Sequence, residues 1–137
     1  MEKSINRPLP RILPEAERFW RSAAAGVLEL QFCLNCQQYI YYPRVRCPHC
    51  LSNTLEWRPT SGKGRIHSFT IARRPTHPAL ASQVPYVIAI VELAEGPRMT
   101  CLIRGCDPED VHIDMPVRTS FLPVREDLAL VDFEPDR

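Results

Sequence analysis

The sequence predicts a mainly β protein in three parts: an N-terminal arm and helix (residues 1–27), a small metal-bound ribbon of strands (28–58) and a C-terminal barrel of five strands (59–137). Three observations lead to this prediction. A helical pattern begins at a proline near the N-terminus, two pairs of cysteines follow at metal-binding spacing, and the rest of the chain alternates short strand patterns with turn signals. A chain of 137 residues buries a limited fraction of its surface, so a metal ion would help to hold a small part together.

The first part holds one short helix. Residues 1–13 are rich in proline and basic side chains and should form an extended arm, and Pro14 suits the first turn of a helix because its missing N–H is not needed there. Phe19, Trp20, Ala23 and Ala24 fall on one side at helical spacing, and Gly26 is a natural stop. Because so short a helix is marginal alone, we expect the two aromatic residues to anchor it, either on the chain's own body or at an interface with a partner protein.

Four cysteines in the second part predict a metal site. Cys33 and Cys36 are separated by two residues, as are Cys47 and Cys50. This spacing lets two turns each present two thiolates to one tetrahedral ion. Apolar and polar residues alternate in the first strand pattern, so its polar side chains are expected to face outward. Strand patterns alternate with the cysteine pairs as in a zinc ribbon, at 28–33, 39–42 and 54–58.

A site of four thiolates leaves no open coordination position for an activated water, so we expect one structural zinc ion there. Iron is chemically possible with the same ligands. The residue after the second cysteine of such a turn favours glycine, because its φ tends to be positive, but this chain has Gln37 and Leu51. We therefore expect strained turns. We interpret His49 as a solvated neighbour of the site rather than an alternative ligand.

The third part is rich in strand patterns and has no helical period. Turn signals such as Glu95-Gly96-Pro97 separate the strands. Five short strands predict a small barrel, for which the five-stranded OB-fold is the leading candidate and a β sandwich the alternative. The candidate strands are 64–71, 86–93, 98–104, 117–122 and 128–133.

One loop of the barrel is a candidate ligand site. Arg73, Arg74 and His77 lie in the loop between the first two barrel strands, which OB-folds often use for ligands. Arginine there can pair with a phosphate or a carboxylate. The alternative is a solvated loop held by its prolines.

No group of residues predicts catalysis. The sequence lacks the serine elbow of hydrolases, the phosphate-binding loop and the glycine fingerprint of dinucleotide-binding proteins. Cys101 and Cys106 lie outside the metal motif, and we interpret them as structural thiols rather than reactive ones. The remaining histidines are scattered along the chain.

Composition argues against two broad classes of protein. The 17 basic and 16 acidic residues give a net charge of +1, whereas a dedicated nucleic-acid module usually has a clear basic excess. The N-terminus has no apolar segment typical of a secretory signal, and no stretch approaches the roughly 18 apolar residues that span a membrane. We therefore expect a cytoplasmic protein, in which paired cysteines serve as metal ligands before disulfides.

The order and spacing of several short motifs resemble one known family. It is the family of acyl-CoA-associated proteins with a rubredoxin-like zinc ribbon followed by an OB-fold, long catalogued as a domain of unknown function. Each motif is weak alone, but together they run along nearly the whole chain. Besides the two cysteine pairs they are Glu17-Arg18-Phe19-Trp20, Tyr42-Pro43-Arg44, Leu55-Glu56-Trp57, Ser61-Gly62-Lys63-Gly64, Pro85-Tyr86-Val87 and Met115-Pro116-Val117.

This resemblance implies a function. Members of the family lack catalytic residues of their own and form a stable complex with a thiolase-like or hydratase-like enzyme that acts on acyl-CoA thioesters. It implies an accessory role for this chain, with the loop of Arg73 and Arg74 as a candidate contact for CoA at a shared interface. The main alternative is a nucleic-acid-binding module, a role in which zinc ribbons and OB-folds also occur. An independent small enzyme has little support.

Overall fold

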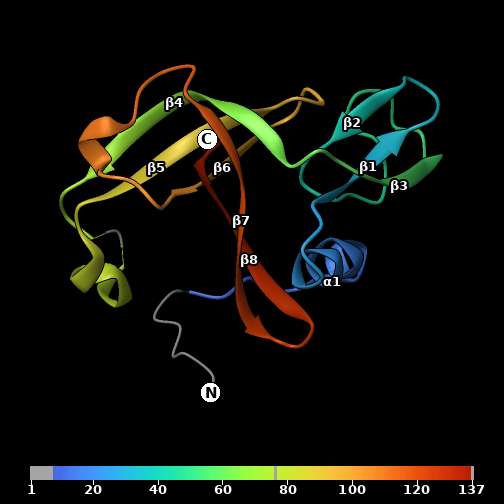
Figure 1. Ribbon diagram of the computed structural model, residues 1–137. Coiled ribbons are helices and arrows are strands. Elements are labelled where there is room, and N and C mark those ends of the chain that lie inside the picture. Colours follow the sequence, from blue (N-terminus) through green and yellow to red (C-terminus); the bar gives the residue numbers. More distant parts are fainter. Residues whose placement is uncertain (1–7, 76, 137) are drawn as a thin grey trace.

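The computed structural model describes residues 8–75 and 77–136. Figure 1 shows the ribbon and the barrel as two β modules, with α1 lying between the ribbon and the β7–β8 hairpin. Among these residues, no helix has both the length and the apolar character needed to cross a bilayer. In chain order the elements are the 3-10 helix η1 (Pro14–Ala16), α1 (Glu17–Ala24), β1 (Glu29–Cys33), β2 (Gln38–Ile40), β3 (Leu55–Pro59), β4 (Lys63–Ala72), the 3-10 helix η2 (Pro78–Gln83), β5 (Tyr86–Leu93), β6 (Arg98–Ile103), the 3-10 helix η3 (Pro108–Asp110), β7 (Pro116–Arg125) and β8 (Leu128–Pro135).

The N-terminal helix begins at a proline and ends at a glycine, as predicted. Pro14 starts η1, which leads directly into α1, and Gly26 has a φ of 84° in the turn that follows the helix. The helix is tied to the ribbon because Arg18 Nε donates a 3.0 Å hydrogen bond to Glu29 Oε1 on β1. This bond lowers the pKa of the Glu29 carboxyl.

The ribbon is an antiparallel sheet in the order β2-β1-β3, which confirms the predicted zinc-ribbon architecture. Two details differ from expectation. Strand β2 is shorter than predicted, so Tyr41 and Tyr42 leave the sheet and turn toward α1. Gln31 is buried rather than outward-facing, because its amide is used by the backbone of Arg44.

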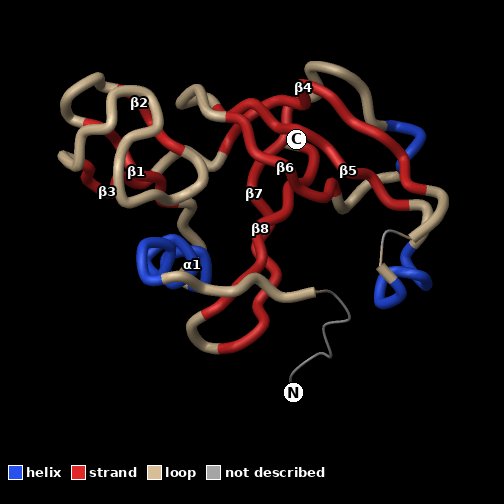
Figure 2. The backbone as a smooth tube through the Cα atoms, turned by 180° about the vertical axis from the view of Figure 1, so that it is seen from behind, coloured by secondary structure: helices blue, strands red, loops and turns tan. Residues whose placement is uncertain are grey.

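The third part closes into a five-stranded barrel in the order β4-β5-β6-β8-β7, with β7 returning to β4. All neighbouring strands are antiparallel except β6 and β8, which run parallel and meet at Ile103 and Phe133. The OB-fold is therefore confirmed and the sandwich is not. Strand β7 extends beyond its predicted end because its hairpin with β8 continues past the barrel and packs on α1 (Figures 1 and 2). Strand β8 is longer at its other end, where Glu134 and Pro135 pair with Arg118 and Val117.

Gly64 allows β4 and β5 to approach closely. A Cβ atom at this position would lie 2.6 Å from the carbonyl oxygen of Glu92 and 2.8 Å from Val91 Cγ1. Beyond it, the pairing of β4 with β5 shifts register between Ile66 and Ser68. Such a bulge bends a strand and increases its twist, which helps a short sheet to close on itself.

One hydrophobic core extends from the barrel to the helix and the base of the ribbon. Phe19 of α1 and Leu30 of β1 belong to the same buried cluster as Phe133 of β8. The ribbon's separate cluster has one fully buried aliphatic residue, Ile40, among its cysteine side chains. This small amount of buried apolar surface is not enough to order the long loops of the ribbon. A bound metal ion would therefore supply much of their stability.

Candidate metal centre and its surroundings

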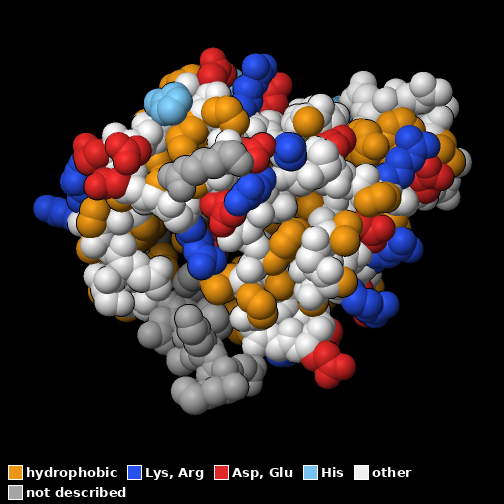
Figure 3. Space-filling view, in the orientation of Figure 1, with side chains coloured by type: hydrophobic (Ala, Val, Ile, Leu, Met, Phe, Trp, Pro, Cys, Tyr) orange, Lys and Arg blue, Asp and Glu red, His pale blue; other side chains and the backbone are white. Residues whose placement is uncertain are grey.

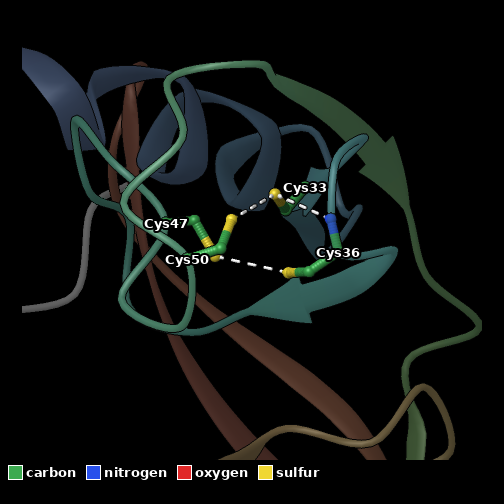
Figure 4. A group of neighbouring side chains, drawn as sticks. All are labelled: Cys33, Cys36, Cys47 and Cys50. Atoms are coloured by element: carbon green, nitrogen blue, oxygen red, sulfur yellow. Dashed lines mark hydrogen bonds between the residues drawn. The ribbon is translucent and has the colours of Figure 1, made fainter.

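The four cysteines predicted to bind metal come together in the ribbon. Cys33 ends β1 and Cys36 lies in the turn before β2, while Cys47 and Cys50 belong to the loop between β2 and β3. Their Sγ atoms all lie within 4.8 Å of one another. Figure 4 shows the sulfurs converging, with 3.6 Å between Cys33 and Cys50 and 3.5 Å between Cys36 and Cys47. A tetrahedral ion with Zn–S bonds of about 2.3 Å sets its sulfurs about 3.8 Å apart. The cluster therefore has the dimensions of a four-thiolate metal site.

Each cysteine pair lies in a turn, and the two turns are closed by equivalent backbone hydrogen bonds. The Gln37 N–H donates to the carbonyl oxygen of Cys33 at 2.8 Å, and the Leu51 N–H donates to that of Cys47 at 2.9 Å. Gln37 has a φ of 57° and Leu51 a φ of 65°. Positive φ in a residue other than glycine costs about 1–3 kcal/mol. The expectation of strained turns at these two positions is confirmed.

Backbone N–H groups also point at the sulfurs. The Cys36 N–H donates to Cys33 Sγ at 3.5 Å, and the His49 N–H donates to Cys47 Sγ at 3.4 Å. Such donors favour the thiolate form that a metal ion requires. The His49 side chain is exposed and does not belong to the four-ligand group, in keeping with its interpretation as a neighbour.

The pKa values of two of these thiols are shifted in opposite directions. Hydrogen bonds from the Asn35 side chain and the Ser52 backbone lower the pKa of Cys50 to about 6. Burial, together with hydrogen bonds to neighbouring cysteines, raises the pKa of Cys36 to about 12. A bound cation would favour the thiolate at all four positions, because its charge is the largest in the site. Four soft sulfur ligands with no open position can hold a structural metal ion, and they offer no place for an activated water.

The predicted anchor residues of the helix are part of an aromatic cluster. The Phe19 ring lies 4.9 Å from that of Trp20, 5.9 Å from Tyr41 and 5.6 Å from Tyr42, measured between centroids. Trp20 Nε1 donates a 2.9 Å hydrogen bond to the Tyr42 hydroxyl, and burial raises the pKa of Tyr41 to about 12. Both helix residues are accounted for by packing within the chain. Direct contact of either with a partner stays a prediction.

The candidate ligand loop is exposed, and two of its side chains have partners inside the chain. Arg73 Nη2 lies 3.0 Å from Glu109 Oε2. His77 Nδ1 accepts a 3.0 Å hydrogen bond from the Ala79 N–H and so caps η2. Arg74 is exposed. The loop joins β4 to β5 as expected, and its binding of a ligand stays a prediction.

Sequence reasoning missed a cleft of about 720 Å³ between the ribbon and the barrel. Tyr39 and His49 line its ribbon side, and Glu95 and Arg98 line its barrel side. Glu95 Oε2 accepts a 2.9 Å hydrogen bond from the Ser61 N–H, while its Oε1 is buried without a partner among the described residues. Only the packing of the two modules creates this cleft, so no local pattern could have revealed it.

Cys101 packs inside the barrel. It is 8% exposed, and burial, with a smaller effect from the Asp132 charge, raises its thiol pKa. A thiol that stays protonated is a poor nucleophile. The geometry favours the structural interpretation of this residue.

Charges of both signs are mixed over the surface. Figure 3 shows basic and acidic side chains interspersed on one face of the molecule, without a wide basic area there. Several of them pair on the barrel, as in Arg118 Nε with Glu134 Oε2 at 3.0 Å. A groove that follows a nucleic-acid backbone needs concentrated positive charge. This face offers none.

Two family models match consecutive parts of the chain. The model described as "ChsH2, rubredoxin-like zinc ribbon domain" matches residues 20–56. The model described as "ChsH2, C-terminal OB-fold domain" matches residues 57–122. Together they span the metal centre and most of the barrel.

Individual proteins extend this likeness over nearly the whole chain. A DUF35 domain-containing scaffold protein of Methanothermobacter thermautotrophicus is 39% identical over 118 residues, which are 85% of this chain and 88% of that protein. The probable enoyl-CoA hydratase alpha subunit of Thermomonospora curvata is 34% identical over 129 residues, which are 94% of this chain but 40% of that subunit. The chain thus spans well under half the length of this relative. In the solved structure of an Ltp2-ChsH2(DUF35) aldolase, one chain superposes with a TM-score of 0.80 at 33% identity, over 93% of this chain and 98% of that one.

Proposed function

The chain belongs to the DUF35 family, which combines a rubredoxin-like zinc ribbon with an OB-fold, and we propose that it is an accessory subunit of an enzyme complex acting on acyl-CoA thioesters. In this role it is not catalytic. It binds a thiolase-like subunit, or a hydratase-like one, and supports the activity of that partner.

The observation that carries the proposal is the likeness to a chain of the Ltp2-ChsH2(DUF35) aldolase. The superposition covers 93% of this chain and 98% of that one, so the two share their fold over nearly their whole length. The hydratase relative supplies the second class of partner, and its name indicates a CoA thioester as substrate. The scaffold relative supports a role in holding other subunits rather than in chemistry.

The described side chains support a non-catalytic role. The four ribbon thiols converge on one closed site. Cys101 is a buried thiol with a raised pKa, and His77 is engaged as a helix cap. A nucleophile needs an adjacent base or a lowered pKa. The pKa of Cys101 is raised instead, and Cys50, whose pKa is lowered, is one of the four thiols of the closed site. The partner subunit would then carry the reaction.

We further propose that the bound ion is one structural zinc, with iron as the chemical alternative. A closed set of four thiolates at these distances suits zinc. We also propose that the chain is divided into three parts, 1–27, 28–58 and 59–137, and that the first part joins the other two. Cys33, Cys36, Cys47 and Cys50 are the proposed ligands.

Co-expression tests the proposal. The tagged chain is produced together with each thiolase-like and hydratase-like protein of its own organism, and complexes are identified by native mass spectrometry. We expect one stable complex, acyl-CoA turnover by that complex, weak turnover by the partner alone and none by the isolated chain. An unrelated acyl-CoA enzyme serves as the negative control. Turnover by the isolated chain, or binding to none of these enzymes, would contradict the proposal.

A further inference from the structure

The loops that hold the metal expose large aliphatic side chains. Leu34 is 48% exposed, and Val45 and Leu51 are each 69% exposed, the highest values among the exposed large hydrophobic residues. Each lies within two residues of a cysteine of the metal centre. We define the ribbon-tip patch as these three residues together with Arg44 and Arg46.

Hydrogen bonds place the segments of the patch side by side. The Leu34 N–H donates to the carbonyl oxygen of Thr54 at 2.9 Å, and the hydroxyls of Thr54 and Ser52 lie 2.6 Å apart. Ser52 directly follows Leu51, whose carbonyl oxygen accepts a 3.3 Å hydrogen bond from Arg46 Nη1. The backbone segments that carry Leu34, Arg46 and Leu51 are therefore linked through these hydrogen bonds.

The backbone of Leu51 follows from the cysteine turn, but its exposed side chain gains nothing from that conformation. Its φ of 65° is unfavourable for a leucine, and its exposed side chain leaves apolar surface in water. Glycine or asparagine would remove much of this cost in the isolated protein. Burial of the side chain in a complex would offset it.

The two arginines of the patch flank Val45 and are free of acidic partners among the described residues. Several other arginines among the described residues are paired with carboxylates, among them Arg18 with Glu29. Figure 3 shows hydrophobic side chains over the ribbon, with both basic and acidic side chains beside them. The patch therefore complements an aliphatic surface bordered by carboxylates, and arginine is itself favoured in protein interfaces.

We propose that the ribbon-tip patch is the surface with which this chain docks on its acyl-CoA enzyme partner, against an aliphatic area bordered by Asp and Glu side chains. This inference rests on the function proposed above. A single-stranded nucleic acid fits less well, because it needs aromatic side chains for base stacking and a basic groove. A second copy of the chain fits less well too, because a twofold contact would bring the arginines of two patches together.

Substitution of Leu51 separates docking from folding because it should move the two in opposite directions. Leu51→Asn should keep or raise the unfolding midpoint, since asparagine tolerates positive φ. It should also raise the Kd for the partner identified by co-expression, by about tenfold or more when combined with Val45→Asn. Ile113→Asn is the matched control, because Ile113 is 53% exposed but lies on the barrel. Calorimetric titration against the purified partner gives the Kd values.

A second pair of variants tests the charges. Arg44→Ala with Arg46→Ala should weaken binding and reduce its salt dependence, whereas Arg125→Ala on β7 should not. A complex whose Kd is unchanged in all patch variants would overturn this docking site and leave the proposed function standing. Binding to neither class of enzyme would overturn both. If the arginine variant instead loses affinity for a short fluorescent oligonucleotide, or the valine variant loses self-association, the patch serves another partner and the proposal is wrong.

Discussion

The side chain of Gln31 forms two hydrogen bonds with the backbone of Arg44. Gln31 Nε2 donates to the Arg44 carbonyl oxygen and the Arg44 N–H donates to Gln31 Oε1, both at 2.8 Å. The Gln31 amide thereby bonds to Arg44 as the backbone of a neighbouring strand would. It ties to β1 the loop that leads to the second cysteine pair. Gln31 is 6% exposed, so these bonds form away from water, where losing one is costly. The metal centre thus depends on a side chain that is not a ligand.

Replacement of Gln31 by leucine should weaken the metal centre without touching a ligand. The backbone N–H and C=O of Arg44 would lose their partners, which costs about 1–3 kcal/mol of unfolding free energy. We expect faster metal release to a chelator and a lower thermal midpoint. Gln38→Leu is the control, because Gln38 is exposed on β2. Equal release rates for the two variants would show that the Gln31 bonds do not support the site.

Loss of a ligand should unfold the ribbon. Cys36→Ser or Cys47→Ser removes one thiolate from the four, and structural zinc contributes roughly 10–16 kcal/mol of apparent binding energy in small finger peptides. We expect metal loss by elemental analysis and disappearance of ribbon signals in an NMR spectrum, while barrel signals persist. Cys106→Ser, outside the cluster, should retain the metal. Freshly purified wild-type protein that contains neither zinc nor iron would refute the metal site.

The close approach of β4 and β5 makes Gly64 intolerant of a larger residue. In Gly64→Ala the new methyl group would meet the Glu92 carbonyl oxygen at 2.6 Å, which forces the strands apart. Overpacking of this kind costs about 1–3 kcal/mol. Chemical denaturation should show the loss. Gly96→Ala serves as a comparison for backbone strain alone, because nothing lies within 4 Å of its added Cβ while its φ of 116° is unfavourable. A Gly64→Ala variant as stable as the wild-type protein would contradict the steric argument.

The Trp20–Tyr42 hydrogen bond should couple the helix to the ribbon. Trp20→Phe and Tyr42→Phe each remove one partner of the 2.9 Å bond, at a cost of about 0.5–1.5 kcal/mol. In a double-mutant cycle the two losses should not add, because the second substitution finds the bond already broken. Trp20→Ala should cost more, about 3–5 kcal/mol, through lost packing. Strictly additive losses would mean that the bond does not couple the two parts, and an affinity change for the partner in Trp20→Phe would support an added interface role.

The Arg73 and Arg74 loop is the proposed contact for CoA phosphates in the complex. Arg73→Ala with Arg74→Ala should weaken CoA binding to the complex, because arginine binds phosphate through paired hydrogen bonds. Arg73 pairs with Glu109 at 3.0 Å, so Glu109→Gln is an informative companion that frees the arginine without removing it. Calorimetric titration of CoA into wild-type and variant complexes measures the effect. An unchanged CoA affinity would restrict the subunit to a structural role.

Several local features followed from the sequence alone. The two cysteine pairs predicted the metal cluster because two intervening residues fix how a turn presents its thiolates, and this geometry is confined to a few consecutive residues. The positive φ of Gln37 and Leu51 followed from the same turn. The strands of the OB-fold were visible because turn residues divide them, and each pairs mostly with a neighbour close in sequence.

Tertiary structure decided what depends on distant residues meeting. Gln31 has the pattern of an outward-facing strand residue. It is buried only because the loop at Arg44 lies beside β1 and bonds to its side-chain amide. Tyr41 and Tyr42 have a strand pattern in the sequence but pack on Phe19 in the structure. Burial of three aromatic rings lowers the free energy more than extension of a short edge strand would. The cleft between ribbon and barrel likewise has no local signal. It arises when segments far apart in the chain come together, and the free energy that joins them belongs to their contacts rather than to either segment.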